Sequence, residues 1–187
     1  MAGQRLPKKV LNETLIFLCK LLNSKEIKDW FIFYGTLLGI VRENGCIDND
    51  DDIDIIISEK HYDIVKKLLI ENGFELETGY GINTSTNILK TKVKNENGQI
   101  KYSSIDIYMS SFENENDIYD KWNRVLLKDC FLDNREKTFI EKEWEGVKLY
   151  LPKDCTRKLE NAYGKDWTIK QNKKINFTYL HQNLGTL

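Results

Sequence analysis

Aspartates are concentrated in one short segment of this chain. The most specific interpretation of this segment is a metal-dependent site. Five aspartates lie within the seven positions from Asp48 to Asp54, and three isoleucines follow directly. Carboxylates this close repel one another strongly unless a cation or water screens them. Side chains on a strand alternate between its faces, so Asp52 and Asp54 should share one face while the intervening isoleucines enter the core. The segment therefore predicts an acidic pair, held by an apolar strand, that binds Mg²⁺ or Mn²⁺.

Two further acids can complete this site. Asp50 precedes the pair by the same two-residue step and can reach the same cation from the turn, whereas Asp51 should point elsewhere. Asp106 stands between two isoleucines of a predicted strand, which is an unfavourable place for a carboxylate without a partner. If the two strands are neighbours, the predicted metal ligands are Asp50, Asp52, Asp54 and Asp106, an arrangement suited to in-line displacement at phosphorus. Asp52, Asp54 and Asp106 are the predicted catalytic residues, and Asp106 is suited to take a proton from an acceptor hydroxyl.

Candidate phosphate-binding residues lie just before the acidic segment. Gly35 and Thr36 follow a short aromatic run and begin a predicted helix, so their backbone amides can face a phosphate. Arg42, one or two helical turns further on, is a candidate phosphate clamp. Its spacing alone favours a surface position on the helix equally well.

Three alternatives to a metal-dependent site are weaker. An isolated acidic run is more often a solvated loop, but the glycine turn upstream and Asp106 downstream favour a metal site here. A calcium-binding EF-hand loop requires glycine at its sixth position, where this chain has Ile53. The segment 79–81 lacks the third glycine of a dinucleotide fingerprint, and the chain has no Walker A lysine motif.

The elements that must position these residues alternate between helices and strands. Hydrophobic periodicity and turn residues predict helices at 10–23, 36–43, 58–71, 115–127 and 154–163. Strands are expected at 30–34, at the end of 47–57, and at 74–77, 88–94, 100–109 and 144–151. Asn97-Gly98 is a hairpin signal between two of them, so the sheet should be mixed or antiparallel at that edge.

Length and composition favour one domain. The chain has 187 residues, of which 41% are hydrophobic, enough for a substantial core. We expect a single domain over 1–187, with its core at about 10–167 and a polar, loosely ordered C-terminal tail. Lys and Arg number 28 against 29 for Asp and Glu, which argues against dedicated nucleic-acid binding. Four scattered cysteines without zinc-ligand spacing favour a reducing compartment, and no apolar run suggests a signal peptide or an integral membrane segment.

One stretch of the chain carries a family resemblance. It reads Gly35-Thr36-Leu37-Leu38-Gly39-Ile40-Val41-Arg42, then Gly45-Cys46-Ile47, then Asp50-Asp51-Asp52-Ile53-Asp54. This string resembles the LicD/fukutin family of phosphotransferases, as do Ile105-Asp106-Ile107-Tyr108 and the Tyr-Gly-x-x-Trp stretch from Tyr163 to Trp167. The resemblance implies an α/β (α+β) nucleotidyltransferase fold, in which a small mixed sheet is flanked by helices.

The same resemblance implies an activity. Such enzymes move a phospho-alcohol, such as phosphocholine or ribitol phosphate, from a CDP-linked donor nucleotide to a hydroxyl of a glycan acceptor, which can be lipid-linked. By this analogy the four acids hold Mg²⁺, or Mn²⁺, and Gly35, Thr36 and Arg42 contact the donor phosphates. A cytoplasmic enzyme, able to work peripherally at the inner membrane surface, is expected. The alternative is a nucleotidyltransferase that transfers NMP from an NTP to a small molecule, RNA or protein. A non-catalytic binding module is less favoured because all four acids are present.

Overall fold

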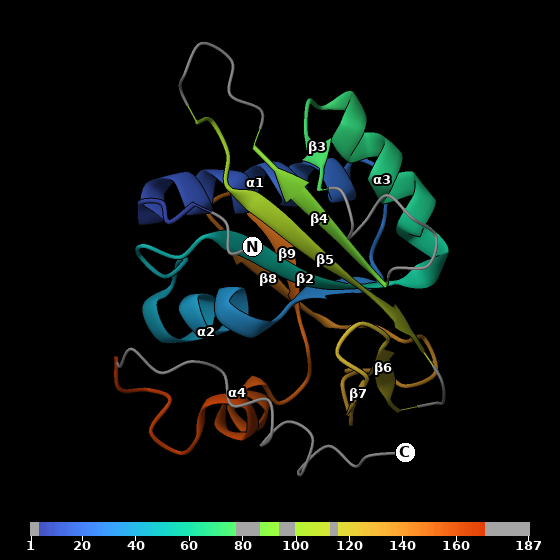
Figure 1. Ribbon diagram of the computed structural model, residues 1–187. Coiled ribbons are helices and arrows are strands. Elements are labelled where there is room, and N and C mark those ends of the chain that lie inside the picture. Colours follow the sequence, from blue (N-terminus) through green and yellow to red (C-terminus); the bar gives the residue numbers. More distant parts are fainter. Residues whose placement is uncertain (1–3, 78–86, 94–99, 113–115, 171–187) are drawn as a thin grey trace.

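A mixed sheet built around the acidic strand forms the centre of the fold (Figure 1). The computed structural model describes residues 4–77, 87–93, 100–112 and 116–170. Its sheet contains β1 (Trp30–Ile32), β2 (Asp52–Ser58), β3 (Glu75–Leu76), β4 (Ile88–Lys92), β5 (Ser104–Ser111), β6 (Ile118–Asp120) and β7 (Val125–Leu127). The strand order is β1-β2-β5-β4-β3, while β6 pairs with β5 and β7 with β6.

The register of the central strands fixes where the acids lie. β2 and β5 are parallel, with Asp54 opposite Asp106, whereas the other strand pairs of this sheet are antiparallel. β4 places Lys90 opposite Asp106. Because paired positions share a face, these three side chains form a row across three strands. The mixed sheet and the neighbouring positions of the two acidic strands are therefore as predicted from the sequence.

Within the described ranges, four helices and a separate hairpin lie around this sheet. The helices are α1 (Lys8–Asn23), α2 (Tyr34–Glu43), α3 (Tyr62–Glu71) and α4 (Cys155–Tyr163), and a 3₁₀ turn, η1 (Glu59–His61), precedes α3. In Figure 1, α1 and α3 lie toward the top, and α2 and α4 lie together toward the bottom. The predicted apolar stripe of α1 is buried and packs in one core with the isoleucines of β2. Burial of this apolar surface is the main stabilising contribution to the acidic strand.

The predicted helix over 115–127 is wrong. This segment instead contributes strands β6 and β7, joined by a tight turn. Asp120 explains the difference, because its Oδ1 accepts hydrogen bonds from the backbone N–H groups of Trp122 and Asn123 at 2.9 and 3.2 Å. An aspartate that bonds to the backbone two residues ahead favours a turn over a helix.

The predicted strand over 144–151 is part of a hairpin. β8 (Ile140–Trp144) and β9 (Val147–Leu151) pair in antiparallel register and are joined by Glu145 and Gly146, which have φ values of 48° and 74°. Two positive φ values in a two-residue loop match the twist of the flanking strands.

Ser58 makes no side-chain capping bond at the turn before α3. The expectations for Asn97-Gly98, for 79–81 and for the tail beyond 170 lie outside the described residues.

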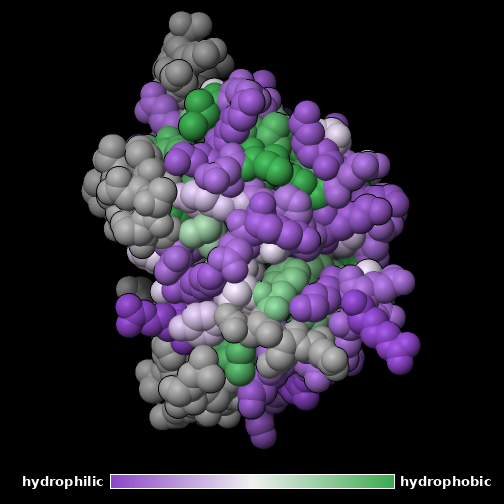
Figure 2. All heavy atoms as spheres, turned by 90° about the vertical axis from the view of Figure 1, so that its right-hand side faces the viewer, coloured by the Kyte–Doolittle hydropathy of each residue, from purple (hydrophilic) through white to green (hydrophobic). Residues whose placement is uncertain are grey.

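The visible surface is predominantly polar. Figure 2 shows hydrophilic side chains over most of one face, interrupted by small apolar groups. The large apolar side chains that are exposed in the described part of the chain are Ile64, Ile70, Leu132 and Ile169. No helix within the described ranges has both the length and the apolar character needed to cross a membrane.

Candidate functional site

Three carboxylates converge on the polar face of the central sheet. Asp52, Asp54 and Asp106 each offer one oxygen, and these oxygens lie within 4.8 Å of one another. Asp54 and Asp106 are only 7% and 3% exposed. The parallel register of β2 and β5 produces this arrangement, because it sets Asp54 beside Asp106, and Asp52 lies two residues before Asp54 on the same face. The structure thus brings together the three residues predicted to be catalytic.

The first turn of α2 holds Asp54 in place. The backbone N–H of Gly35 donates to Asp54 Oδ2 at 3.2 Å, and the backbone N–H of Asp54 donates to Thr36 Oγ1 at 2.8 Å. Tyr108, two residues after Asp106 on β5, donates its hydroxyl to Asp54 Oδ1 at 3.2 Å. A helix N-terminus favours a nearby negative charge. Of the two residues predicted to contact phosphate, Gly35 therefore contacts the buried Asp54 carboxylate in this structure, and Thr36 contacts the backbone N–H of Asp54.

Two glycines allow backbone and carboxylates to approach closely. A Cβ on Gly35 would lie 3.0 Å from Asp50 Oδ2 and 3.4 Å from Asp54 Oδ2. A Cβ on Gly39 would lie 2.6 Å from the carbonyl oxygen of Gly45, a separation that requires the backbone to move. The first glycine therefore leaves room for two acids, and the second lets α2 pack against the segment leading to the acidic strand.

The remaining acids of the segment have different roles. Asp50, a predicted ligand, groups with Asp51 and Asp52 within the same 4.8 Å limit rather than with Asp106. The expectation that Asp51 points elsewhere is wrong, because its carboxylate lies beside those of its two neighbours. The bend between Asn49, with a φ of 63°, and β2 interrupts the strict alternation assumed from the sequence. Asp48 Oδ1 accepts a hydrogen bond from the backbone N–H of Lys8 at 2.9 Å, and so binds a backbone donor at the start of α1.

The acids of this cluster are held in an unfavourable electrostatic environment. Burial, followed by the charges of Asp106, Asp51 and Asp50, raises the pKa of Asp52 to about 8. Burial, followed by Asp52 and Asp106, raises the pKa of Asp54 well above its ordinary value, although the Tyr108 hydroxyl lowers it. Converging carboxylate oxygens with excess negative charge are the donor set that hard divalent cations prefer. The residues present therefore fit Mg²⁺ or Mn²⁺.

Lys90 is a site residue that sequence reasoning missed. Its Nζ donates to Asp106 Oδ2, and its side chain is 19% exposed. Burial lowers the pKa of Lys90, but the charges of Asp106, Asp52 and Asp54 outweigh this effect and raise it. Lys90 could have been identified only from the register of the predicted hairpin, in which it lies directly opposite Asp106.

Tyrosines line the side of the site that faces α4 and the β6–β7 hairpin. Tyr34 is buried, as expected for a core residue, and donates its hydroxyl to Asp120 Oδ2 at 2.6 Å. Asn123 Nδ2 donates to the same Tyr34 hydroxyl at 2.8 Å. The Tyr163 hydroxyl of α4 is buried with no hydrogen-bond partner in the described structure, and burial followed by the charge of Asp54 raises its pKa.

Arg42 does not contact the carboxylate cluster directly in this structure. Its Nη2 lies 2.6 Å from Glu43 Oε1, and its Nη1 donates to the carbonyl oxygen of Trp167 at 3.4 Å. Its side chain is 11% exposed. The guanidinium therefore joins the end of α2 to the segment after α4, and the proposed phosphate clamp would have to exchange Glu43 for a phosphate.

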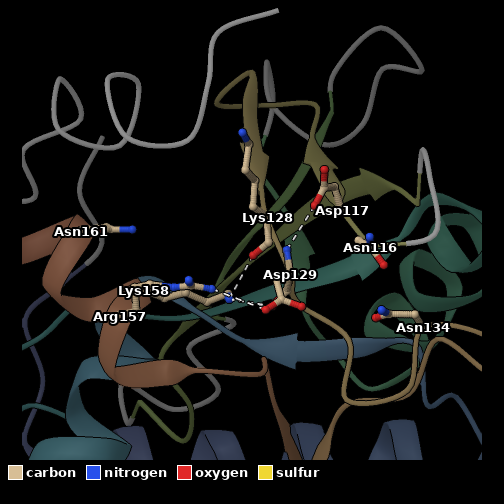
Figure 3. A pocket seen from close by; sticks show the side chains of 8 residues that line it. All are labelled: Asn116, Asp117, Lys128, Asp129, Asn134, Arg157, Lys158 and Asn161. Carbon is tan, nitrogen blue, oxygen red and sulfur yellow. Dashed lines mark hydrogen bonds and ion pairs between the residues drawn. The ribbon is translucent and has the colours of Figure 1, made fainter.

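A pocket of about 450 Å³ lies apart from this cluster, between α4 and the flanks of the β6–β7 hairpin (Figure 3). Its lining residues are Asn116, Asp117, Lys128, Asp129, Asn134, Arg157, Lys158 and Asn161. They include none of the site residues predicted from the sequence. Lys158 Nζ, at the pocket wall, donates to the carbonyl oxygens of Lys128, Asp129 and Lys153 at 3.2, 3.0 and 2.7 Å.

Known proteins resemble this chain in sequence family and in fold. Residues 28–154 match the family model described as LicD/FKTN/FKRP, nucleotidyltransferase domain. The lincomycin-bound lincosamide antibiotic adenylyltransferase LnuA superposes with a TM-score of 0.55 at 14% identity, covering 83% of this chain and 85% of that one. The Cid1 poly(U) polymerase gives a TM-score of 0.38 at 19% identity, covering 57% of this chain and 32% of that one. Among curated proteins, none matches this chain significantly. The predicted nucleotidyltransferase fold is thereby confirmed.

Proposed function

Because this chain belongs to the LicD/FKTN/FKRP family of nucleotidyltransferase domains, and is therefore an enzyme of the transferase type, we propose that it transfers a phospho-alcohol from a CDP-activated donor to a glycan hydroxyl. Phosphocholine and ribitol phosphate are the groups we expect. The observation that carries the proposal is the convergence of three buried or half-buried carboxylates from two parallel strands. Such a site is costly to the folded protein without a cation, so a metal-dependent role accounts for its presence.

The proposed metal ligands are Asp52, Asp54 and Asp106, with Asp50 at the edge of the group. A divalent cation bound there would neutralise phosphate oxygens and stabilise the leaving group. The protein's own residues supply the positioning: Gly35 and Thr36 fix Asp54 against the first turn of α2, and Tyr108 fixes its other oxygen. A preformed arrangement of this kind lowers the cost of aligning the reacting groups.

We assign the proton acceptor to Asp106. It lies on the central strand β5, directly opposite Asp54 on β2. Removal of the proton from the acceptor hydroxyl by this carboxylate would leave the oxygen free to attack the donor phosphorus, with CMP as the leaving group. The donor phosphates would lie beside the N-terminal turn of α2, close to Gly35 and Thr36, where backbone amides and the helix dipole favour anions. Arg42 would reach them after releasing Glu43.

A nucleotide panel tests the identity of the donor. In thermal-shift measurements with Mg²⁺ and either CDP, CMP, ATP or GTP, the cytidine nucleotides should raise the melting temperature most, because a ligand bound to the native state stabilises it. CDP-choline and CDP-ribitol, incubated with candidate glycans, should then release CMP. Equal stabilisation by all four nucleotides would contradict a CDP-specific donor.

The second candidate is transfer of a nucleotide group from an NTP to a small molecule, RNA or protein. It is favoured by the likeness of fold to an adenylyltransferase over 83% of this chain. The two functions differ in where the nucleotide goes, so an NTP and a CDP-alcohol, each labelled in its nucleoside and the phosphate attached to it, are tested in parallel. Label found covalently on an acceptor supports nucleotidyl transfer, whereas label confined to free CMP from a CDP donor supports phospho-alcohol transfer.

A further inference from the structure

The Lys90 ammonium contacts a carboxylate, that of Asp106, which the proposed metal ion would also need. Its Nζ contacts Asp106 Oδ2, the side chain of Asp106 is only 4% exposed, and the two residues are opposite one another on β4 and β5. The lysine reaches the acids from a strand, so the register of the sheet, and not a loop, sets its position. The backbone of Lys90 is therefore held beside Asp106 whether or not its side chain makes this contact.

The position of Lys90 gives it influence over the whole cluster. Its charge acts on Asp106 first and also on Asp52 and Asp54, the other two members of the converging trio. Three carboxylates with one ammonium leave a net negative charge, so the site is only partly compensated. Partial compensation keeps the acids together and still leaves the cluster attractive to a divalent cation.

We propose that Lys90 is an exchangeable counter-cation: it stabilises the acidic site while no metal is bound and leaves Asp106 when a divalent cation binds there. This inference rests on the proposed metal site. An ammonium and a divalent cation on one carboxylate repel each other strongly in a partly buried environment, and this repulsion favours departure of the ammonium when the metal ion binds. Lys90 is therefore a positioning residue that competes with the metal ion.

If Lys90 competes with the metal ion, Lys90→Met should lower the melting temperature without metal and raise the affinity for Mn²⁺. Without metal, the variant should melt at a lower temperature than the wild type, because three carboxylates lose their nearest positive charge. With metal, the variant should bind Mn²⁺ about tenfold more tightly, because the ion no longer has to displace an ammonium. A lysine that acted only as a structural ion pair, retained beside the metal, would produce no tightening.

The experiment measures Mn²⁺ binding by titration calorimetry and melting temperature in EDTA, so neither readout depends on an activity assay. Lys92→Met is the matched control, because Lys92 lies on the same strand but is exposed and pairs in register with Glu75. It should leave both readouts near the wild-type values. Lys90→Arg keeps the charge and should restore wild-type Mn²⁺ affinity and much of the stability in EDTA.

The outcomes separate this inference from the proposed function. If the wild type binds no Mn²⁺, the proposed metal site fails. If the wild type binds Mn²⁺ but Lys90→Met binds it equally or more weakly, the competition is overturned while the metal site stands. Should Lys90→Met not fold in EDTA, Lys90→Gln, which keeps a hydrogen-bond donor without the charge, is purified with Mn²⁺ and compared in the same titration. Tighter binding by that variant supports exchange, and equal or weaker binding refutes it.

Discussion

Two regions of the molecule gather charged side chains, the acidic site on β2, β4 and β5 and the pocket beside α4. In the pocket, Asp129 lies 3.5 Å from Arg157 Nη2 (Figure 3). Asp129 also lies 2.9 Å from Lys153 Nζ, and the hydrogen bond from Lys153 lowers the pKa of Asp129. In the acidic site the pKa of Asp52 rises to about 8, because burial and neighbouring acids outweigh the charge of Lys90. In the pocket the acid is paired with protein cations, whereas the carboxylates of the acidic site are not fully neutralised by the protein.

This difference indicates which region needs a ligand. Lys158 is 5% exposed, yet its ammonium donates to three backbone carbonyls, so its burial is compensated within the protein. The carboxylates of Asp52, Asp54 and Asp106 converge without equivalent compensation. An unbalanced, partly buried cluster in a transferase fold is better explained by function than by stability. In the pocket beside α4, by contrast, Asp129 is paired with protein cations.

The largest contrast should appear in activity. Asp54→Asn removes one charge from the cluster with little change of shape, and we expect the transfer rate to fall by about 10³-fold or more, since a proposed metal ligand is lost. Asp129→Asn removes one charge from the balanced region and should change the rate by less than about twofold. Rates are measured on the donor identified by the nucleotide panel. Near wild-type activity of Asp54→Asn would remove this residue from the site.

The free energy of unfolding, unlike the activity, should depend strongly on a residue of the pocket beside α4. Lys158→Met leaves three backbone carbonyls without their donor and should lower the free energy of unfolding by about 3 kcal/mol, because buried unsatisfied acceptors are costly. The Mn²⁺ affinity of the folded variant should be unchanged. Urea denaturation and calorimetric titration of the same preparation check both statements. Weakened Mn²⁺ binding in this variant would mean that the two regions are coupled.

The two regions should also respond to pH with opposite signs. The pKa of Asp52 is raised, so its contribution to stability is fully present below its unfolded value of about 4 and is lost as pH rises toward about 8. In EDTA the melting temperature should therefore fall over this range, and saturating Mg²⁺ or Asp52→Asn should reduce the fall. The pKa of Asp129 is lowered, so its contribution is present above the unfolded value and is lost as pH falls below about 4. A melting temperature that rises toward pH 8 in EDTA would contradict the first statement.

A smaller effect, on Mn²⁺ affinity, is expected from substitution of Gly35, which lies against two carboxylates. Gly35→Ala would place a methyl group 3.0 Å from Asp50 Oδ2, so this carboxylate must shift. We expect Mn²⁺ affinity to weaken by about threefold, a cost of less than about 1 kcal/mol, because Asp50 lies at the edge of the converging trio. Titration of Gly35→Ala against the wild type measures this. A loss as large as that of Asp54→Asn would make Asp50 a central ligand.

The acidic strand was predictable because its physical pattern is local. Alternating isoleucines and aspartates set the two faces of β2, and a lone aspartate between isoleucines on β5 indicated a partner in a neighbouring strand. The parallel pairing that joins them puts Asp54 and Asp106 side by side, which is the condition on which the predicted site depended. The C-terminal ends of α1 and α4 followed from apolar periodicity and from Gly164, whereas α1 begins at Lys8, two residues before the predicted start.

Other features depended on long-range or side-chain contacts that periodicity does not encode. Lys90 belongs to the site only because β4 pairs with β5 in one register. Arg42 is engaged by Glu43, its own neighbour, and by a carbonyl 125 positions away. The helix expected over 115–127 was replaced by strands because Asp120 bonds to the following backbone. Register and local side-chain bonding are therefore what the sequence patterns left undetermined.

The most direct test of the shared cation site is a crystal structure of the protein soaked with Mn²⁺ and CDP. Anomalous scattering locates the ion without reference to any assumed ligand. We predict a Mn²⁺ peak bonded to oxygens of Asp52, Asp54 and Asp106, with the Lys90 ammonium moved away from Asp106. A Mn²⁺ peak in the pocket beside α4, or no peak at the three carboxylates at saturating Mn²⁺, would contradict the account.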